Sequence, residues 1–299
     1  MTFSIIARDA VTGQLGVAVQ SHWFSVGSLV SFARSGVGAV ESTDPIFGIR
    51  CLNQMIRPKH SAQKVLESMI KRDAETEARQ IAIIDAKGNV AVHTGSRCFP
   101  AAGHVTGNQF SCQANTMKNH TVWSKMKDAF AQKSKLPFAE RMVAALEAGQ
   151  QAGGDIRGQQ SSSLLVVSSK RSKFPEMERI IDLRVEDHPK PIEELKRLLR
   201  LQRAYEWARK APALMFRDEY EASAQAYDKA IKYAPSIAEL KYWKAVNLVA
   251  SGKMSESRAI FKSISRTKEE KATWKLLTKN LVKVGLFPSD NSGTMKIFS

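Results

Sequence analysis

The residues that follow the initiator methionine alternate between polar and apolar side chains. Phe3 and Ile5 fall on one side of an extended chain, and Thr2 and Ser4 fall on the other. A repeat of two residues is that of a β-strand with two different faces. The pattern therefore predicts a strand over residues 2–8, with Thr2 and Ser4 on one face.

Short strand-like runs and helical patterns fill the chain from this strand to about residue 190. Strand-like runs occupy residues 15–19, 28–33, 37–40, 80–84, 90–94, 110–114, 162–168 and 180–185, and helical patterns occupy residues 47–72, 121–131 and 137–151. The two kinds of element come in blocks, which argues against a doubly wound parallel sheet. The order favours an α+β domain of two mostly antiparallel sheets with helices outside.

Strand patterns stop near Pro191, and helix-forming residues dominate beyond it. Small and aromatic residues recur there about 34 positions apart, a period typical of tetratricopeptide repeats. The pairs are Ala204 and Ala238, Ala211 and Ala245, Leu214 and Leu248, Ser223 and Ser257, and Tyr227 and Phe261. We predict a first domain over residues 1–190, an all-α tetratricopeptide-like module over 191–287, and a loose tail over 288–299.

The chain is basic, with 45 Lys and Arg against 29 Asp and Glu and a net charge of +16. This balance favours an acidic partner or an anionic surface. Lys271, Lys275, Lys279 and Lys283 recur every four residues and form one stripe on a helix. The stripe is either a site for an acidic protein partner or a solvated face. No nucleic-acid-binding motif accompanies the charge, so nucleic acid is not the expected partner.

Several classes of protein are disfavoured by the composition. No apolar run approaches the roughly 20 residues of a membrane span, and no basic segment followed by an apolar one opens the chain. We therefore expect a cytoplasmic protein with no membrane contact. Cys51, Cys98 and Cys112 lack metal-like spacing and are expected to be reduced thiols. The patterns leave open whether the chain forms a homo-oligomer.

A threonine directly after Met1 is a candidate for chemistry. Removal of Met1 would give Thr2 a free α-amine beside its own hydroxyl. In such a residue the hydroxyl attacks, and the amine, with a reference pKa of about 7.7–8.0, accepts its proton. The alternative interpretation is that a soluble domain simply begins with a strand.

Several short motifs occur together in the first two thirds of the chain. They are Thr2-Phe3-Ser4-Ile5-Ile6-Ala7-Arg8-Asp9, Gly16-Val17-Ala18-Val19 with Val26-Gly27-Ser28, Gly36-Val37-Gly38-Ala39-Val40, His93-Thr94-Gly95, Ala102-Gly103-His104, Gln113-Ala114-Asn115, residues 152–158 and residues 182–189. In combination, residues 2–201 resemble an uncharacterised family of the N-terminal-nucleophile (Ntn) hydrolase superfamily, domain of unknown function ten-twenty-eight. The resemblance implies a four-layer αββα sandwich and hydrolysis of an amide C–N bond, with no metal or other cofactor. It implies no particular substrate.

One segment departs from the pattern of that family. After Val40 a Thr-Gln pair and a slightly longer loop are expected, whereas this chain has Glu41-Ser42-Thr43-Asp44-Pro45. If this segment lines the pocket, we expect a different substrate or a reduced activity.

The reaction would also need hydrogen-bond donors for the oxyanion of a tetrahedral intermediate. Asn115, an amide just after a predicted strand, is our candidate donor. The alternative is that Gln113 and Asn115 cap a turn.

Three more residues are candidates for substrate binding. Asp155 and Arg157 follow a double glycine and either orient a substrate carboxylate or the Thr2 amine, or form a salt bridge within a loop. His22 lies in a polar and aromatic loop. The separations of His22, His93 and His104 do not match those of metal ligands, so we expect no metal site.

Two functions from different classes therefore compete. In the first, the chain is a hydrolase of a small amide with Thr2 as the nucleophile. In the second, the first domain is an inactive scaffold, and the helical repeats act as an adaptor that binds a protein partner. The state of Met1 discriminates between them, because a retained Met1 leaves Thr2 without a free α-amine.

Overall fold

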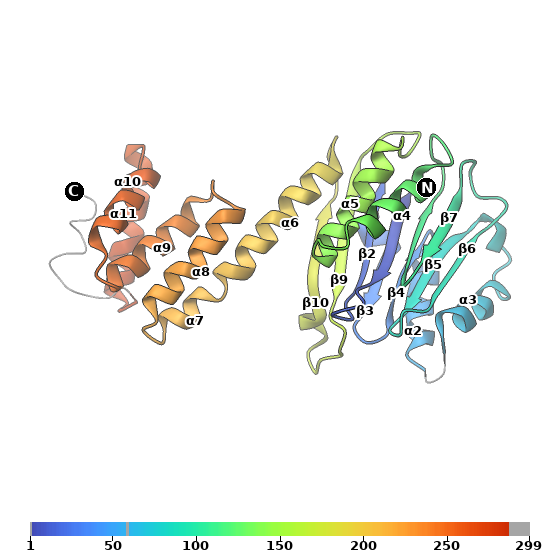
Figure 1. Ribbon diagram of the computed structural model, residues 1–299, viewed down its shortest axis with the longest axis horizontal. Coiled ribbons are helices and arrows are strands. Elements are labelled where there is room, and N and C mark those ends of the chain that lie inside the picture. The colour runs from blue at the N-terminus through green and yellow to red at the C-terminus, as the bar shows by residue number, and fades with distance from the viewer. Residues whose placement is uncertain (1, 58–59, 287–299) are drawn as a thin grey trace. The chain divides into compact units, whose positions relative to one another are not determined.

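The computed structural model describes residues 2–57 and 60–286. The chain divides into two compact units, Met1–Leu198 and Leu199–Ser299. The first unit is mixed α+β with antiparallel sheets, and the second consists of helices (Figure 1). This order of a mixed unit followed by a helical region confirms the prediction at that level. The tail predicted over 288–299 lies outside the described residues.

Two antiparallel sheets form the first unit. The larger has the strand order β10-β9-β2-β1-β8-β7, and the smaller has the order β3-β4-β5-β6. The larger sheet contains β1 (Phe3–Arg8), β2 (Leu15–Ser21), β7 (Gly103–Gly107), β8 (Phe110–Ala114), β9 (Ser161–Val167) and β10 (Arg179–Val185). The smaller contains β3 (Ser31–Arg34), β4 (Gly38–Ser42), β5 (Gln80–Asp85) and β6 (Val90–Thr94). β1 is central, so that Phe3 lies opposite both Gln20 on β2 and Ala114 on β8.

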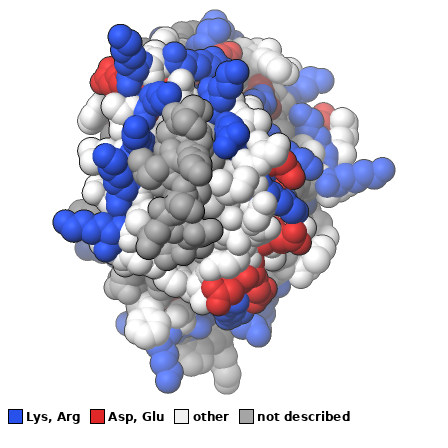
Figure 2. Space-filling view, turned by 90° about the vertical axis from the view of Figure 1, so that its left-hand side faces the viewer, with Lys and Arg blue, Asp and Glu red and all other residues white. Residues whose placement is uncertain are grey.

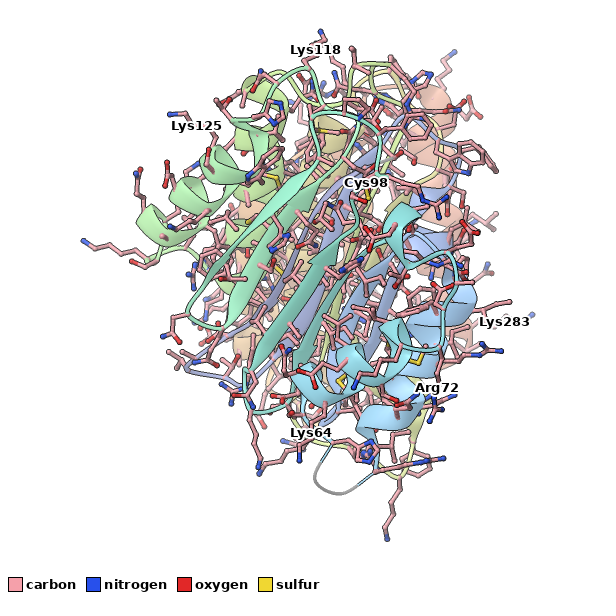
Figure 3. The ribbon with its side chains drawn as sticks, turned by 90° about the vertical axis from the view of Figure 1, so that its right-hand side faces the viewer. Lys64, Arg72, Cys98, Lys118, Lys125 and Lys283 are labelled. Atoms are coloured by element: carbon pink, nitrogen blue, oxygen red, sulfur yellow. The ribbon has the colours of Figure 1, made fainter. Side chains whose placement is uncertain are left out.

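The two sheets face each other and carry helices on their outer sides (Figure 1). The larger sheet is covered by α4 (Val122–Gln132) and α5 (Phe138–Gln151), and the smaller by α2 (Pro45–Met55) and α3 (Ala62–Ile70). Figure 3 shows these layers, with α3 near Lys64 and α4 at Lys125 on opposite sides of the strands. The short helices α1 (Val26–Val30), η1 (Thr76–Ala78) and η2 (Pro175–Glu178) complete the unit.

Alternation along the strands decides what lies between the sheets. Ile6 on β1, Ala39 on β4 and Ala82 on β5 belong to one buried apolar cluster between them. Val40 and Ile83 point the other way and pack in the cluster formed with α2 and α3. Because successive side chains alternate between faces, these strands serve two cores at once.

The layer between the sheets becomes polar toward one end. The same strand faces that carry Ile6, Ala39 and Ala82 continue as Ser4 and Thr2 on β1 and its start, Glu41 on β4, and Gln80 on β5. Gln113 and Asn115 join them from β8 and its end. All six polar residues are buried. Burial of so many polar groups is costly unless they are paired, so this end of the layer is the natural place to look for function.

The predicted strand over residues 28–33 is wrong in its first half. α1 covers Val26–Val30, and β3 begins only at Ser31. Val26 and Val30 are four residues apart and cluster with Val19, so the spacing of apolar residues here is that of a helical turn.

β7 is a further strand, which the strand-like runs of the sequence did not include. Gly103 lies against the ring of Trp123, and a Cβ there would come within 2.5 Å of it. Gly107 lies similarly against Phe110, at 2.2 Å. These glycines therefore permit close packing in an edge strand instead of breaking it.

Over its described residues, 199–286, the second unit contains five helices beyond the long α6. The helices are α6 (Pro191–Ala208), which begins in the first unit, α7 (Ala211–Met215), α8 (Tyr220–Tyr233), α9 (Ala238–Ala250), α10 (Met254–Ile264) and α11 (Lys268–Lys283). The spacing seen in the sequence reappears as matching contacts. Ser223 Oγ donates to the Ala211 carbonyl at 2.9 Å, and Ser257 Oγ donates to the Ala245 carbonyl at 2.9 Å.

α9 and the stretch of chain 34 residues before it differ in one respect. α9 is continuous, whereas the corresponding stretch is broken near Arg209 and Lys210 into the end of α6 and the short α7. Pro212 lies in the first turn of α7, and proline lacks the N–H that a continuous helix would use there. The break therefore has a local cause in the sequence.

No helix within residues 2–57 and 60–286 is both long and apolar enough to span a bilayer. In Figure 2 more Lys and Arg than Asp and Glu are visible on the face presented to the viewer, in keeping with the net charge of +16.

Candidate functional site

A pocket of about 240 Å³ opens at the polar end of the layer between the sheets. Its lining residues are Thr2, Ser21, Trp23, Val26, Leu29, Val30, Thr43, Pro45 and Arg157. They come from the starts of β1 and α2, the end of β2, α1 with its preceding loop, and the segment after α5. The wall is mainly apolar, with three hydroxyls and one guanidinium, which suits a small ligand that has an apolar part and a polar group.

Thr2 is held in this wall by the register of the central strand. Its carbonyl accepts a hydrogen bond from the Asn115 N–H at 3.0 Å, which continues the pairing of β1 with β8 by one residue. Thr2 is only 3% exposed, and its Oγ1 has no hydrogen-bond partner among the described residues. A buried hydroxyl without a partner costs about 1–3 kcal/mol. Because Thr2 lines the pocket, a ligand that reaches this hydroxyl could provide the missing partner.

Glu41 faces the same buried space from the opposite sheet. It is fully buried on β4, and the causes that act on its carboxyl include the hydroxyls of Ser4 and Thr2 and the amide of Gln113. None of these groups completes a hydrogen bond with it: both carboxylate oxygens lack a partner within the described part of the chain. The Gln113 amide instead donates to Ser4 Oγ at 2.8 Å.

The protonation of Glu41 is set by competing effects. Burial raises its pKa from 4.5 to about 7. The positive charge at the chain's amino terminus and the polar groups of Ser4, Thr2 and Gln113 act in the opposite direction. The carboxyl is therefore poised to exchange a proton near neutral pH, in direct proximity to Thr2.

Asn115 lies beside Thr2 but uses its side chain in a structural network. Its Nδ2 donates to Gln80 Oε1 at 2.8 Å. The Gln80 Nε2 is anchored in turn by the carbonyl of Ala114 and the hydroxyl of Thr94, both at 3.0 Å. Asn115 is not among the residues that line the pocket, although Nδ2 carries a second hydrogen that could serve as a donor. The alternative of a turn cap does not describe these contacts, which join both sheets.

Asp155 and Arg157 form the loop salt bridge that the sequence allowed, and this bridge aims Arg157 at the pocket. The buried Asp155 Oδ2 accepts from Arg157 Nη2 at 2.7 Å, and Oδ1 accepts from Nε at 3.0 Å. Of the two, only Arg157 lines the pocket. Asp155 therefore positions the guanidinium, and Arg157 presents it.

His22 sits near this pair without reaching the pocket wall. Its backbone N–H donates to Asp155 Oδ2 at 3.4 Å. Its ring Nδ1 is buried with no partner among the described residues. The structure thus places His22 behind the wall, next to Asp155, where it can fix the loop that leads to the exposed Trp23.

The double glycine has a local role in bringing Asp155 to the site. Gly153 and Gly154 have φ values of 121° and 60°, in a region that residues with a Cβ rarely adopt. The Gly154 N–H bonds back to the Gly149 carbonyl and ends α5. Thr116, with φ of 66°, then accepts the Ile156 N–H at 3.0 Å, so that the loop is tied to the end of β8.

Sequence reasoning missed two residues of the buried network. Glu41 belongs to a segment noted for its departure from the family pattern, but no role was assigned to it. The alternation of Ala39, Val40 and Glu41 would have placed its side chain between the sheets. Gln80 gave no signal, because a polar residue at the start of a strand is common.

Other candidate chemistry finds little support around the site. Burial raises the pKa of the Cys51 thiol to about 12 and raises that of Cys112 further, which disfavours their thiolates. Across residues 2–57 and 60–286, no group of three or more His, Cys, Asp and Glu side chains is placed to hold a metal ion.

The fold and the site together define a mixed α+β domain with antiparallel sheets and a threonine-lined pocket. Residues 2–195 match the model of a family of unknown function, DUF1028, and the chain belongs to that family. A crystal structure of protein SPO2555 from Silicibacter pomeroyi, described as a DUF1028 protein, is 29% identical with a TM-score of 0.59. The match covers 66% of this chain and 87% of that one.

A second solved structure is Anbu, the ancestral beta-subunit from Yersinia bercovieri. It is 14% identical with a TM-score of 0.32, and the match covers 65% of this chain and 92% of that one. No curated protein matches the chain.

Proposed function

We propose that the chain hydrolyses a small amide, with the hydroxyl of Thr2 as the nucleophile. One observation carries the proposal: Thr2 Oγ1 is buried without a partner among the described residues, and Thr2 lines a pocket of about 240 Å³. A threonine that a rigid strand holds in a pocket wall, with its hydroxyl beside a group able to take its proton, suits nucleophilic catalysis once a substrate reaches that hydroxyl.

The layers of the first unit support the same reaction class. Helices, two facing sheets and further helices follow one another as in the four-layer αββα sandwich of Ntn hydrolases. The resemblance to that superfamily implies that the nucleophile is the residue after Met1. Here that residue is Thr2, at the start of the central strand β1.

The chemistry would proceed in two halves. Thr2 Oγ1 attacks the amide carbonyl carbon, and its proton passes to a nearby acceptor. The C–N bond then breaks, and the amine leaves with that proton. Water next hydrolyses the ester on Thr2, which releases the acid and restores the hydroxyl. Two acceptors are available: the α-amine exposed by removal of Met1, as the resemblance implies, and Glu41.

The pocket restricts the substrate. Trp23, Leu29 and Pro45 favour an apolar group, and Arg157 favours a carbonyl or carboxylate oxygen. Arg157 keeps its direction through Asp155. We therefore expect a small amide with an apolar part and an oxygen-rich group a short distance from the scissile bond.

The first prediction tests Thr2 by substitution. Thr2→Ala should abolish turnover in an amide library, because it removes the attacking oxygen, whereas Thr2→Ser should retain part of the rate. Asn115→Ala should cost no more than the roughly 10²–10³-fold loss typical of one oxyanion donor. Thr76→Ala is the matched control, since Thr76 Oγ1 is also buried without a described partner but lies outside the pocket.

Intact mass of each protein should be measured beside turnover. An active Thr2→Ala variant would exclude Thr2 as the nucleophile. Full activity with Met1 still attached would exclude the α-amine as the proton acceptor while leaving Thr2 in place.

A protein-binding role of the second unit is a separate proposal. The matched contacts of Ser223 and Ser257 are consistent with a tetratricopeptide-like arrangement. The specific observation in its favour is that Lys271, Lys275, Lys279 and Lys283 of α11 are all exposed, which suits an acidic partner.

A further inference from the structure

Glu41 and Thr2 are two groups of the buried network whose side-chain oxygens need a partner. Both carboxylate oxygens of Glu41 and the Oγ1 of Thr2 have no hydrogen-bond partner among the described residues. They come from different sheets, β4 and the start of β1, which pack against each other, and both side chains are buried in the layer between these sheets. The Thr2 hydroxyl is also among the groups that lower the pKa of the Glu41 carboxyl. A hydrogen bond from Thr2 Oγ1 to a Glu41 oxygen would give each group a partner.

We propose that Glu41 is the catalytic base of the site: it accepts the proton of the Thr2 hydroxyl and returns it to the leaving amine. This inference rests on the proposed function, because it requires Thr2 to be the nucleophile. The inference replaces the α-amine, the proton acceptor that the resemblance implies, with Glu41. Glu41 belongs to residues 41–45, the segment that departs from the family pattern.

The energetics of Glu41 favour this role over a structural one. An ionised carboxylate buried without hydrogen bonds is destabilising, and a structural carboxylate is normally surrounded by donors. Asp85 on the neighbouring strand is an example, since it accepts bonds from the backbone N–H groups of Lys87 and Asn89 at 2.9 and 3.0 Å. No donor completes a hydrogen bond with Glu41 among the described residues, although the polar groups of Ser4, Thr2 and Gln113 lower its pKa, so its carboxyl can take up and release a proton.

The position of the carboxylate also disfavours the amine as base. If Met1 is removed, the new α-amine belongs to Thr2, which shares the buried layer between the sheets with Glu41. A neighbouring carboxylate stabilises the ammonium form of an amine and raises its pKa. An ammonium group cannot accept a proton, so the carboxylate is the better acceptor near neutral pH.

The proton balance of the cycle is complete. The Thr2 Oγ1–H bond breaks, its proton moves to a Glu41 oxygen, and Oγ1 forms a bond to the carbonyl carbon. When the C–N bond breaks, Glu41 gives this proton to the departing nitrogen. In the second half Glu41 takes a proton from the attacking water and returns it to Oγ1 as the ester C–O bond breaks. No external oxidant, reductant or metal takes part in these steps.

Few charged groups influence the protonation of the Glu41 carboxyl. The elements around it contribute the hydroxyls of Ser4 and Thr2 and the amide of Gln113, and the positive charge of the chain's amino terminus also lowers its pKa. The neighbouring strand residues on β3 and β5 are Ser31 and Ala82, neither of which titrates. A pH dependence of Thr2 reactivity near neutrality therefore belongs to Glu41 and the terminal amine.

The test uses β-lactones, whose ring opens on attack and leaves the whole probe as an ester on the nucleophile. Labelling of the full chain is followed by intact mass, and the site is found by peptide mapping. Glu41→Gln should slow labelling of Thr2 by about 10²–10⁴-fold, the usual contribution of a general base. It should also remove the rise in rate between pH 6 and 8 in the wild type. Asp85→Asn is the matched control, because it neutralises another buried carboxylate of the same sheet.

The outcomes separate the two proposals. Slow and pH-independent labelling of Glu41→Gln, with normal labelling of Asp85→Asn, supports the inference, as does labelling of protein whose α-amine is acetylated. Equal rates and equal pH profiles for wild type and Glu41→Gln overturn the inference and leave Thr2 as the nucleophile. A wild-type protein that no β-lactone labels at Thr2, or a Thr2→Ala variant that reacts as fast, overturns the proposed function itself.

Discussion

The residues of the site gain their properties from where strand alternation puts them. Glu41 is buried because it shares a face of β4 with Ala39, and Thr2 is buried because it shares a face of β1 with Ile6. Burial then raises the pKa of Glu41 to about 7. A raised carboxyl pKa means that the folded state holds a proton that the unfolded state has released, so the site affects stability as well as chemistry.

The pH dependence of stability follows from this shift. Between pH 4.5 and about 7 the folded chain binds the Glu41 proton and the unfolded chain does not, so stability falls as pH rises through this range. Above about 7 both states are ionised and the contribution stays constant. The difference amounts to about 3 kcal/mol. Wild type should therefore lose more stability than Glu41→Gln between pH 5 and 7.5, measured by urea unfolding.

The Glu41→Gln variant contains every titrating group of the wild type except Glu41. The difference in stability between the two proteins therefore isolates the effect of Glu41. Identical changes in the two proteins over this pH range would mean that Glu41 titrates normally in the folded state. The buried environment described here would then be wrong.

At the scale of elements, most of the first unit could be predicted from alternation. The patterns at 90–94 and 137–151 correspond to β6 and to α5. One failure has a partly tertiary cause. β7 was missed because its glycines make room for Trp123 and Phe110, which are distant in the sequence or lie across a turn.

The site was less predictable than the fold, because its contacts join segments far apart in the chain. Thr2 and Arg157 were identified as candidates and do line one pocket. Asp155 and His22 lie behind Arg157, an order that the sequence could not reveal. Strand alternation could have placed the Glu41 side chain between the sheets, whereas Gln80 could be recognised only once the two sheets were placed face to face.

The lysine stripe of α11 supports a prediction about one helix. The helix starts at a capping box in which Thr267 Oγ1 accepts the Glu270 N–H at 3.1 Å, so it does not depend on the lysines for its start. Replacing Lys271, Lys275, Lys279 and Lys283 by Gln should preserve the fold and weaken binding of a polyglutamate peptide at least tenfold. Binding by wild type should also fall sharply at about 1 M salt, where the screening length is about 3 Å.

A second set of four lysines provides the control for total charge. Lys64, Lys118, Lys125 and Lys133 are exposed on the first unit, and three of them are marked in Figure 3. Their replacement by Gln makes the same change in net charge. Equal weakening by both sets would mean that the peptide responds to overall charge and that α11 has no special role.

At the scale of the whole molecule, the change of sequence pattern and the change of packing fall at different residues. Strand patterns end near Pro191, whereas the two compact units divide between Leu198 and Leu199, inside α6. The first turns of α6 belong to the first unit through specific contacts. Ser162 Oγ donates to the Pro191 carbonyl at 2.8 Å, and Lys196 forms an ion pair with Glu147 of α5. A domain boundary drawn at the pattern change would cut these contacts.

The last prediction follows from these contacts and concerns two fragments. A chain of residues 1–201 should unfold cooperatively, because it keeps the sheets, their helices and the first turns of α6. A chain of residues 1–190 should be less stable by about 3 kcal/mol or more, since it loses the buried Ile192 and Leu195, and each buried aliphatic side chain is worth about 1.5–3 kcal/mol. Urea unfolding of both fragments, monitored by circular dichroism, measures the difference. Equal stability would place the start of α6 outside the first unit, whereas a 1–201 fragment that unfolds without cooperativity would mean that the second unit completes its core.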